Sequence, residues 1–293
     1  MSRIAYVNGR YIPHDQAAVH IEDRGFQFAD GVYEVCAVLD GIILDLASHL
    51  ERLSHSLSEL NITPPVGQRA LCVILTQMIK RNRLENGLVY VQITRGVAPR
   101  DHVFPGKTTQ PSLIMTARNV DYGAYDDMAV RGVSVIGVPD TRWGRCDIKS
   151  VSLLPNILAK QAAREAGAFE AWMVDDTGLV TEGSSTNAWI IDDQDRLITR
   201  PLGPDILSGV TRRFLIEVVA MRCGLTVIEQ PFTIQQAQNA QEAFITAATI
   251  MVLPVVKIDG VSLGKGNAGP ISLKLRDAYR NAVRHVAAHQ PRV

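Results

Sequence analysis

The sequence predicts an α+β N-terminal domain followed by an α/β C-terminal domain. In the first part of the chain, paired short strands precede amphipathic helices, whereas strands and helices alternate along the second part. The 293 residues, 46% of them hydrophobic and 20% charged, suffice for two domains with separate cores. We expect domains over residues 1–120 and 132–293. A linker is expected over 121–131, because the pattern lapses there into tyrosine, aspartate and glycine.

The N-terminal domain opens with two predicted hairpins. Asn8-Gly9 lies between β-prone runs in "IAYVNGRYI", and Asp40-Gly41 divides "GVYEVCAVLDGIILDL" in the same way. Both dipeptides favour tight two-residue turns between antiparallel strands. The chain is therefore expected to begin with two antiparallel strand pairs.

An amphipathic helix is predicted after the second hairpin. Ser48 and Glu51 have the spacing of a capping box, and leucines recur at helical spacing through "SHLERLSHSLSELNI". A second helix is expected over residues 70–84, and it leads into the strand "GLVYVQITRGV". Strands followed by helices make this first domain α+β.

The C-terminal part alternates between predicted helices and strands. After a helical region, a hairpin "FEAWMVDDTGLVTEG" and a strand "NAWIIDD" precede the helix "LSGVTRRFLIEVVAMRCG", which Gly224 closes. A strand-like segment, "EAFITAATIMVLPVVKIDG", follows. No segment has the spacing G-x-x-x-x-G-K-[ST] of a P-loop site, so this kind of site is disfavoured.

The composition limits the classes of partner that the protein is expected to bind. Thirty Lys and Arg balance thirty Asp and Glu without any block of like charge, so we expect neither nucleic acid nor a membrane surface as partner. A small molecule is the expected ligand. The absence of a signal-peptide core or a membrane-length apolar run predicts a soluble, cytoplasmic protein. Four widely spaced cysteines without a C-x-x-C pair argue against a zinc or disulfide framework, and no metal site is expected.

Lys149 is the first candidate for catalytic chemistry, because it stands between an isoleucine and a run of small and aliphatic residues. Burial lowers the pKa of an amine and makes it a nucleophile that can form an imine with an aldehyde. The alternative is a structural lysine that pairs with Asp147 or extends into solvent. Chemistry with pyridoxal phosphate would also require a carboxylate for the ring nitrogen and donors for the phosphate.

Two other segments could meet those requirements. Glu182 ends an apolar strand in "LVTEGSSTNAW" and could bind a pyridinium nitrogen, or it could be an exposed glutamate at a hairpin end. "ILSGVTRR" opens a helix with Ser208, Gly209 and Thr211, where free backbone N–H groups could bind an anion. The alternative there is ordinary helix capping by Ser208.

Taken in order, these segments closely resemble the class IV pyridoxal-phosphate aminotransferases, the group that holds D-amino acid and branched-chain aminotransferases and aminodeoxychorismate lyase. The resemblance covers nearly the whole chain. It is carried by "DRGFQFADGVYEV", "HLERL", "RGVAPRDHVFP", "RCDIKSVSLLPNILAKQAAREAGAFEA", "VTEGSSTN", "LSGVTRR" and "FITAATIMVLPVV". It implies a fold-type IV architecture like that of D-amino acid aminotransferases, a cofactor-binding C-terminal domain and pyridoxal 5′-phosphate as cofactor.

The resemblance also implies roles for individual residues. Lys149 would hold the cofactor aldehyde and then move a proton between the substrate Cα and the cofactor carbon C4′. Glu182 would bind the pyridine nitrogen, and Arg52 with the backbone of two helix residues would bind the phosphate. Besides Lys149, the expected cofactor-binding residues are Arg52, Glu182, Ser185, Leu207, Val210, Thr211 and Ala248.

The loop "RGVAPRDHVFP" indicates the substrate. Residues two apart in an extended loop project the same way, so Arg100 and His102 could converge on one carboxylate, although a solvated basic loop is the alternative. In D-amino acid aminotransferases, which this loop resembles, an R-x-H pair and a tyrosine matching Tyr33 bind the substrate carboxylate. The neighbouring subunit of a homodimer supplies that loop. Thr249 is a further expected substrate-binding residue.

The expected function is therefore transamination between D-amino acids, of the D-alanine and D-glutamate type, and 2-oxo acids by a ping-pong mechanism. A branched-chain or (R)-amine aminotransferase is the alternative, followed by an aminodeoxychorismate lyase and a cofactor-free binding module. One departure from the family pattern is that Ala247 and Ala248 replace the usual hydroxyl residues of the phosphate loop. Met251 also stands where a glutamate is common. Phosphate binding would then depend there on backbone N–H groups, or on Ser185 and Thr211.

Overall fold

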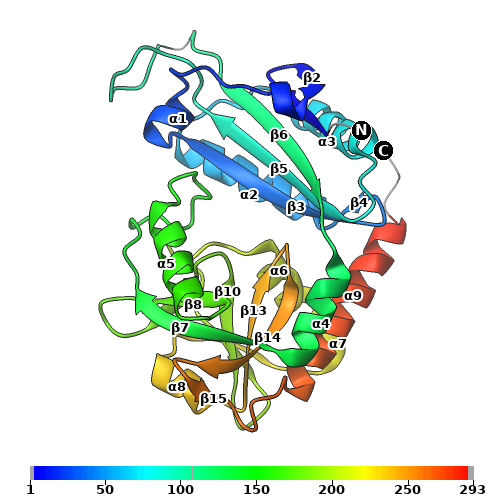
Figure 1. Ribbon diagram of the computed structural model, residues 1–293, viewed down its shortest axis with the longest axis vertical. Coiled ribbons are helices and arrows are strands. Elements are labelled where there is room, and N and C mark those ends of the chain that lie inside the picture. The colour runs from blue at the N-terminus through cyan, green and yellow to red at the C-terminus, as the bar shows by residue number, and fades with distance from the viewer. Residues whose placement is uncertain (1–2, 107, 290–293) are drawn as a thin grey trace. The chain divides into compact units, whose positions relative to one another are not determined.

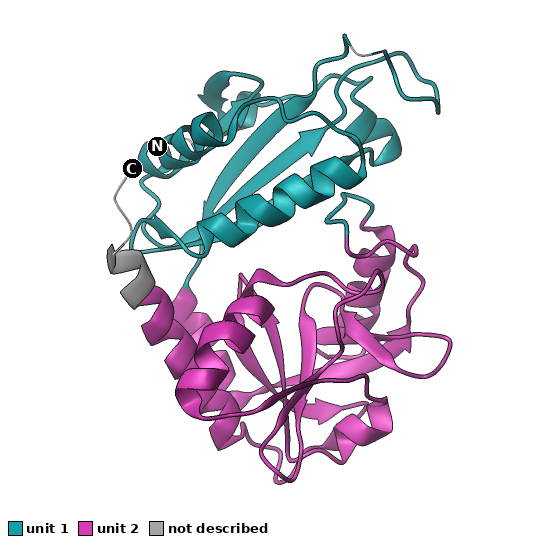
Figure 2. Ribbon diagram, turned by 180° about the vertical axis from the view of Figure 1, so that it is seen from behind, with its two compact units in different colours: residues 1–121, 148–152, 287–293 teal, residues 122–147, 153–286 magenta. Residues whose placement is uncertain are grey.

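The computed structural model describes residues 3–106 and 108–289 and divides into two compact units, coloured separately in Figure 2. The first unit comprises Met1–Asp121, Ile148–Ser152 and Ala287–Val293, and the second comprises Tyr122–Asp147 and Leu153–Val286. The segment that contains Lys149 thus belongs to the first unit, although it lies far beyond the expected N-terminal domain of residues 1–120. Residues 1–2 and 290–293 of the expected domains lie outside the described residues.

A six-stranded antiparallel sheet forms the centre of the first unit, in the order β2-β1-β6-β5-β3-β4 (Figure 1). Both predicted hairpins are confirmed. Asn8 and Gly9 have φ of 45° and 91°, and Asp40 and Gly41 have φ of 52° and 76°, as a type I′ turn requires. The strands are β1 (Ile4–Val7), β2 (Arg10–Pro13), β3 (Gly31–Leu39), β4 (Ile42–Ile43), β5 (Gly87–Thr94) and β6 (Ser112–Asn119).

Two long helices, α2 (Leu46–Glu59) and α3 (Gln68–Asn82), cover one face of this sheet (Figure 2). Leu57 of α2 and Leu75 of α3 are buried in one core cluster with strand residues such as Val91. The leucine spacing therefore predicted α2 correctly. The unit also contains a 3₁₀ turn at His14–Gln16 and the short helix α1 (Arg24–Phe28).

The expected capping box of Ser48 and Glu51 is wrong. α2 begins at Leu46, so both residues lie inside the helix, and the N-cap is Asp45, whose φ is 51° and whose side chain makes no cap hydrogen bond. The backbone N–H of Leu44 still pairs with the β3 strand, through the Ala37 carbonyl at 2.9 Å. The helix therefore starts as soon as this hairpin pairing ends.

A nine-stranded mixed sheet forms the centre of the second unit. Its order is β12-β11-β10-β13-β14-β7-β8-β9, with β15 beside β14. The pairs β11/β12, β14/β7 and β7/β8 are parallel, and the others are antiparallel. The strands are β7 (Val133–Pro139), β8 (Glu170–Val174), β9 (Val180–Gly183), β10 (Asn187–Ile191), β11 (Leu197–Thr199), β12 (Val227–Glu229), β13 (Glu242–Ala247), β14 (Met251–Ile258) and β15 (Val261–Ser262).

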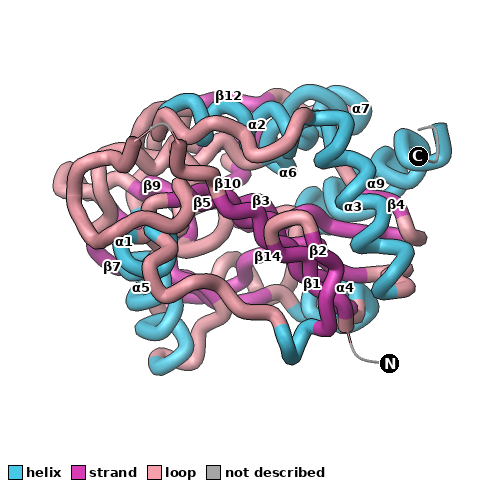
Figure 3. The backbone as a smooth tube through the Cα atoms, turned by 90° about the horizontal axis from the view of Figure 1, so that it is seen from above, coloured by secondary structure: helices cyan, strands magenta, loops and turns pink. Residues whose placement is uncertain are grey.

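The helices of the second unit alternate with these strands along the chain, as expected for its α/β part. Figure 3 colours the helices and strands of the whole chain differently. They are α4 (Tyr122–Arg131), α5 (Leu154–Glu165), α6 (Val210–Phe214), a π-helical turn (Leu215–Ala220), α7 (Met221–Cys223), α8 (Ile234–Gln238) and α9 (Pro270–His289). The segment expected as a linker forms α4. Its Tyr125, Met128 and Ala129 pack on the core, so the tyrosine-rich pattern is the buried face of a helix.

In the part of the chain that the structure describes, no helix is long and apolar enough to cross a membrane. No group of three His, Cys, Asp or Glu side chains among those residues could hold a metal ion. The four cysteines are free thiols, with Cys36 and Cys146 buried.

Candidate active site

Lys149 lies in a short segment that pairs with the first residues of β3. Its carbonyl oxygen accepts a hydrogen bond from the Tyr33 N–H at 3.0 Å. Its own N–H donates to the hydroxyl of Ser56, on α2, at 3.1 Å. The sheet and the helix of the first unit therefore fix the lysine backbone from two sides.

The Lys149 ammonium lies over the Tyr33 ring, with Nζ 4.2 Å from the ring centroid. Among the described residues it makes no hydrogen bond or ion pair. Asp147, the alternative structural partner, is bound instead by the Arg145 guanidinium at 2.9 and 2.8 Å. Lys149 is half-buried. An amine that is held at its base but not paired at its tip suits covalent chemistry.

Arg52 belongs to a buried ionic cluster. Its Nε and Nη2 donate to the two carboxylate oxygens of Glu34 at 2.8 Å each, and His49 Nδ1 lies 2.7 Å from the same carboxylate. Burial favours the neutral acid, but Arg52 and His49 outweigh it and hold the pKa of Glu34 well below its usual range. Burial likewise opposes charge on His49, yet Cys36 and Glu34 raise its pKa to about 9. The Arg52 guanidinium and the His49 ring thus share one buried carboxylate.

Arg100 and His102 lie on an exposed loop of the first unit and share one aromatic partner. The Arg100 Cζ is 4.6 Å from the centroid of the Phe28 ring, and the His102 ring centroid is 5.5 Å from it. The predicted pair is therefore brought together on one ring. Tyr33, the expected third member of the group, stacks on Tyr90 with ring centroids 5.7 Å apart.

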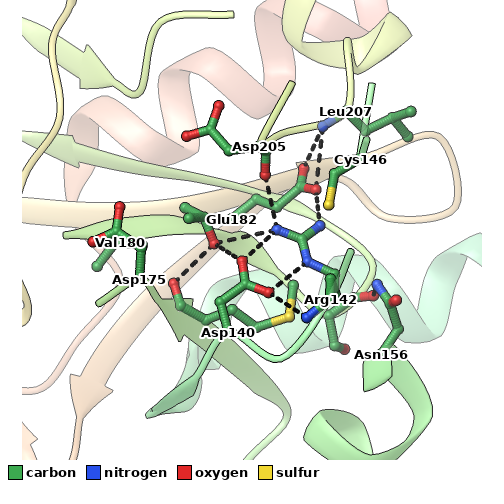
Figure 4. A network of polar contacts seen from close by, with 12 residues as sticks. Asp140, Arg142, Cys146, Asn156, Asp175, Val180, Glu182, Asp205 and Leu207 are labelled. Atoms are coloured by element: carbon green, nitrogen blue, oxygen red, sulfur yellow. Dashed lines mark hydrogen bonds and ion pairs between the residues drawn. The ribbon is translucent and has the colours of Figure 1, made fainter. Parts of the chain in front are cut away.

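Glu182 lies at the end of β9 and is only 6% exposed, which excludes the alternative of an exposed glutamate at a hairpin end. Its carboxylate accepts hydrogen bonds from Arg142, from Asn187 Nδ2 at 3.0 Å and from the Leu207 N–H at 3.1 and 3.2 Å (Figure 4). The structure therefore brings Leu207 and Glu182 together. Leu207 acts on this carboxylate through its backbone.

Arg142 joins Glu182 to a second carboxylate, that of Asp140 (Figure 4). Its Nε and Nη2 donate to Asp140 at 2.9 and 2.7 Å, and Nη2 also donates to the Asp205 carbonyl at 2.9 Å. Burial opposes the cation, but Asp140 and Glu182 raise the pKa of Arg142 above its ordinary value. One cation between two carboxylates leaves these three groups with a net negative charge, which favours a protonated base beside Glu182.

Ser185 is part of a different cluster. Its hydroxyl donates to Glu170 Oε2 at 3.0 Å, and Glu170 also accepts from the Ser184 hydroxyl and from the Ala171 N–H at 2.9 Å. Lys160 Nζ lies 3.4 Å from the same carboxylate. Lys160 is thus tied into a structural ion pair, in contrast to Lys149.

The helical segment 210–223 begins with features of an anion site. Its N-cap is Gly209, without a side-chain cap, so Ser208 is not the capping residue. A Cβ atom on Gly209 would lie 1.9 Å from Asn187 Oδ1, so only glycine fits there. The Thr211 hydroxyl is buried and has no hydrogen-bond partner among the described residues. A buried hydroxyl without an internal partner, beside free helix N–H groups, suits an external anion.

Ala248 and Thr249 lie in the turn between β13 and β14, and both are partly exposed. Met251 ends this turn with φ of 61°, a left-handed conformation that costs energy for a residue with a side chain. Arg276 Nη1 donates to the carbonyls on either side of Met251, at 2.8 and 2.6 Å. The buried guanidinium therefore stabilises the turn in this conformation.

Arg142, Asn187 and Glu34 bind candidate site residues and were not predicted from the sequence. A signal existed for Glu34, since it is a charged residue inside the apolar run "GVYEVCAVL". Arg142 lies only seven positions before Lys149, but the sequence does not show that it reaches Glu182, 40 positions away. Long-range pairing of this kind leaves no periodic pattern.

Comparison with known proteins identifies the family of this chain. A family model described as amino-transferase class IV matches residues 31–258. A D-alanine aminotransferase of Bacillus licheniformis is 40% identical over 277 residues, which cover 94% of this chain and 95% of the relative. A D-alanine aminotransferase of Staphylococcus haemolyticus is 37% identical over 279 residues, 95% of this chain and 97% of the relative.

Comparison with solved structures places the fold in the same family. The crystal structure of a branched-chain aminotransferase from the thermophilic archaeon Thermoproteus uzoniensis, with norvaline, superposes with a TM-score of 0.84 at 26% identity. The match covers 97% of this chain and 95% of that chain, so the two proteins share the fold-type IV architecture. By sequence over most of its length and by fold over nearly all of it, this chain belongs to the class IV aminotransferases.

Proposed function

We propose that this chain is a D-amino acid aminotransferase, which moves an amino group from a D-amino acid of the D-alanine or D-glutamate type to a 2-oxo acid in a ping-pong cycle. The main support is the Arg100 and His102 pair, exposed together on the Phe28 ring. A guanidinium and an imidazole on one support suit the α-carboxylate of an amino acid. The similarity to D-alanine aminotransferases, at 40% and 37% identity, favours the same substrate class.

A branched-chain specificity is the second candidate, because branched-chain enzymes are among the solved structures with this fold. An (R)-amine has no carboxylate and would leave Arg100 and His102 without a role. A lyase would likewise have no evident use for this pair. The Arg100 and His102 pair therefore favours transamination of an amino acid over reaction with an (R)-amine and over a lyase reaction.

The residues of the chain fit pyridoxal 5′-phosphate, the cofactor of class IV aminotransferases. The unpartnered hydroxyl of Thr211 and the backbone N–H groups of Val210 and Thr211 suit the phosphate. Arg52, held by two hydrogen bonds to Glu34, is proposed as a further phosphate ligand. The buried carboxylate of Glu182, in a cluster with net negative charge, suits a protonated pyridine nitrogen.

When bound, this cofactor supplies an aldehyde that captures the substrate nitrogen and a ring that accepts electrons from the substrate Cα. Lys149 Nζ would hold the cofactor through its aldehyde. Once a substrate amine has taken its place, the same amine would serve as general base and acid for the proton that moves between the substrate Cα and the cofactor carbon C4′. Glu182 holds the proton on the ring nitrogen, and Arg100 with His102 binds the substrate carboxylate. Tyr33 and Thr249 are proposed to line the substrate position.

We also propose a cytoplasmic homodimer in which the Arg100 loop of one copy serves the site of the other. Leu154, Ile157 and Leu158 of α5 are 67%, 60% and 61% exposed, and their spacing places them on one helix face. Val103 and Phe104 on the Arg100 loop are 72% and 57% exposed. Exposed apolar side chains gathered in this way are typical of protein interfaces. Four free cysteines suit a reducing compartment.

Replacing Lys149 tests the cofactor attachment. Lys149→Ala should lose nearly all transamination and lack any cofactor fixed by borohydride, because no other amine is proposed to bind the aldehyde. Lys160→Ala is the control, since Lys160 is paired with Glu170, and it should retain borohydride labelling. Peptide mapping by mass spectrometry locates the reduced cofactor. A label on Lys160 in the wild-type protein would rule out the assignment.

Glu182→Gln tests the electron-accepting step. The amide keeps the size of the side chain but removes the negative charge that holds the ring proton, so Cα proton transfer should slow by roughly 10²-fold or more. Cofactor binding should persist, because the phosphate contacts and Lys149 are unchanged. Stopped-flow spectroscopy of the half-reaction with D-alanine measures the rate of Cα proton transfer and shows whether the cofactor is bound. Turnover near the wild-type rate would require another partner for the ring nitrogen.

Arg100→Ala tests the carboxylate site. Loss of a charge-assisted hydrogen bond costs about 1.5–3 kcal/mol, so kcat/KM for D-alanine should fall roughly tenfold to over a hundredfold. The half-reaction of an (R)-amine, followed in single turnover, should change little because this substrate has no carboxylate. The cofactor spectrum should also be unchanged. Equal losses for the two substrates would argue against a carboxylate-binding role.

Mixed dimers test whether the loop acts across the interface. Lys149→Ala and Arg100→Ala copies are each defective, but a hybrid dimer would contain one site with both Lys149 and a partner-supplied Arg100. Random exchange makes half the dimers hybrid, so activity should recover to about a quarter of the wild-type value. The assay compares D-alanine turnover before and after subunit exchange. No recovery, despite hybrids seen by native mass spectrometry, would place the loop at its own copy's site.

A further inference from the structure

Two buried arginines meet on one carboxylate beneath the Arg100 loop. Arg24 Nε donates to Asp30 Oδ2 at 2.8 Å, and Arg95 donates to the two oxygens of Asp30 at 2.7 and 3.0 Å. Arg24 is 3% exposed and Arg95 is 8% exposed. Removing one partner from such a buried group leaves an uncompensated charge and destabilises the fold. None of these three residues has a part in the chemistry described above.

Arg24 reaches from this cluster to the loop backbone. Its Nη1 donates to the Asp101 carbonyl at 2.6 Å and makes a longer contact of 3.4 Å with the Val103 carbonyl. These are the carbonyls on either side of His102. The guanidinium of Arg24 thus holds both backbone groups that flank one of the two proposed carboxylate-binding residues.

Phe28 extends the same support to the side chains. Its ring lies 4.8 Å from the Arg24 Cζ, 4.6 Å from the Arg100 Cζ and 5.5 Å from the His102 ring centroid. Arg24 and Arg100 therefore both contact the ring that carries the proposed pair. Through this ring and through the loop carbonyls, Arg24 contacts the surroundings of both residues.

Local features of the segment "DRGFQFADG" place Arg24, Phe28 and Asp30 correctly. The Asp23 carboxylate caps α1 by accepting the Gly25 N–H at 2.9 Å. A Cβ atom on Gly25 would lie 2.2 Å from the Thr94 side chain, so α1 packs closely on β5 only with glycine here. Ala29 then ends the helix in the left-handed conformation, and the chain turns so that Asp30 faces back to Arg24.

We propose that Arg24 is a positioning residue for the substrate carboxylate, which acts by holding Arg100 and His102 in the binding arrangement; this inference rests on the proposed function. The pair lies on an exposed loop, and an exposed loop without such anchors would have to be ordered at each binding event. Anchoring through buried charge-assisted hydrogen bonds supplies that order in advance. Arg24 itself does not touch the substrate.

Arg24→Gln is the test variant, because it removes the fork between Asp30 and the loop carbonyls but keeps a polar side chain. The kcat/KM for D-alanine should fall roughly 10- to 100-fold, mainly through KM, since misplacement of binding groups weakens capture of the carboxylate. Single turnover of an (R)-amine and the cofactor spectrum should stay within about twofold of wild type. A purely structural role of Arg24 would lower the rates with D-alanine and with the (R)-amine by the same factor.

Arg95→Gln is the matched control. Arg95 shares Asp30 and lies over the Phe104 ring of the loop, with Cζ 3.6 Å from the centroid, but its other donors bind the carbonyls of Leu60 and Asn61, at 2.8 and 3.1 Å, and not those beside His102. Both variants should lose thermal stability, whereas the rise in KM for D-alanine should be several-fold larger for Arg24→Gln. Equal rises in the two variants would assign the effect to general loosening of the cluster and overturn the proposal.

A variant that already lacks Arg100 and His102 distinguishes a failure of the positioning role from a failure of the proposed function. In an Arg100→Ala/His102→Ala protein, adding Arg24→Gln should cost no more than about twofold in D-alanine turnover, because Arg24 acts only through the missing pair. A full multiplicative loss would overturn the positioning role. If Arg100→Ala by itself shows no selective loss for D-alanine, the proposed function fails. If that loss is seen but Arg24→Gln behaves like wild type, only the positioning inference fails.

Discussion

The backbone pairing between β3 and the segment around Lys149 is the interaction on which the candidate site depends. Val32 and Ser150 form an isolated bridge, and the hydrogen bonds on either side of it join Tyr33 to Lys149 and Val151 to Gly31, at 3.0 Å each. The segment Ile148–Ser152 thereby joins the first unit, although the chain before and after it belongs to the second. An amine is held beside β3, the strand that also carries Tyr33 and Glu34.

Buried arginine–carboxylate groups organise the rest of the site. Glu34 fixes Arg52, Asp30 fixes Arg24 and Arg95, and Arg142 lies between Asp140 and Glu182. The group at Asp30 contains two cations and one anion, whereas the group at Arg142 contains one cation and two anions. This difference in sign matches the proposed ligands, because a substrate carboxylate needs positive surroundings and a protonated ring nitrogen needs negative ones. Breaking any such buried pair costs about 3–5 kcal/mol, so function and stability are linked at these positions.

Local signals were predictable from the sequence. The Asn8-Gly9 and Asp40-Gly41 turns follow from backbone preferences of adjacent residues, and α2 follows from leucine spacing. The start of α2 was not predictable in the same way, since continued hairpin pairing at Leu44 decides it. The helix α4 was missed because its tyrosines resembled a linker until the core that buries them was known.

The site was only partly predictable for the same reason. The family resemblance named Lys149 and Glu182 as candidates, but the contacts that hold these residues join distant positions. Asp30 pairs with Arg95 across 65 positions, and Arg142 reaches Glu182 across 40. No short motif encodes such pairs, and only the folded chain shows which carboxylate each arginine faces. Only the structure shows that Ser185 binds the carboxylate of Glu170 and that the Leu207 N–H binds that of Glu182.

We propose that the substrate is a D-amino acid, and the absorbance of the bound cofactor can test this. The most direct measurement mixes the purified holoenzyme with D-alanine, L-alanine or L-leucine and follows conversion of the bound cofactor to its amino form by stopped-flow absorbance. We expect rapid conversion with D-alanine and conversion slower by orders of magnitude with either L-amino acid. Faster conversion with L-leucine than with D-alanine would contradict it and identify a branched-chain enzyme.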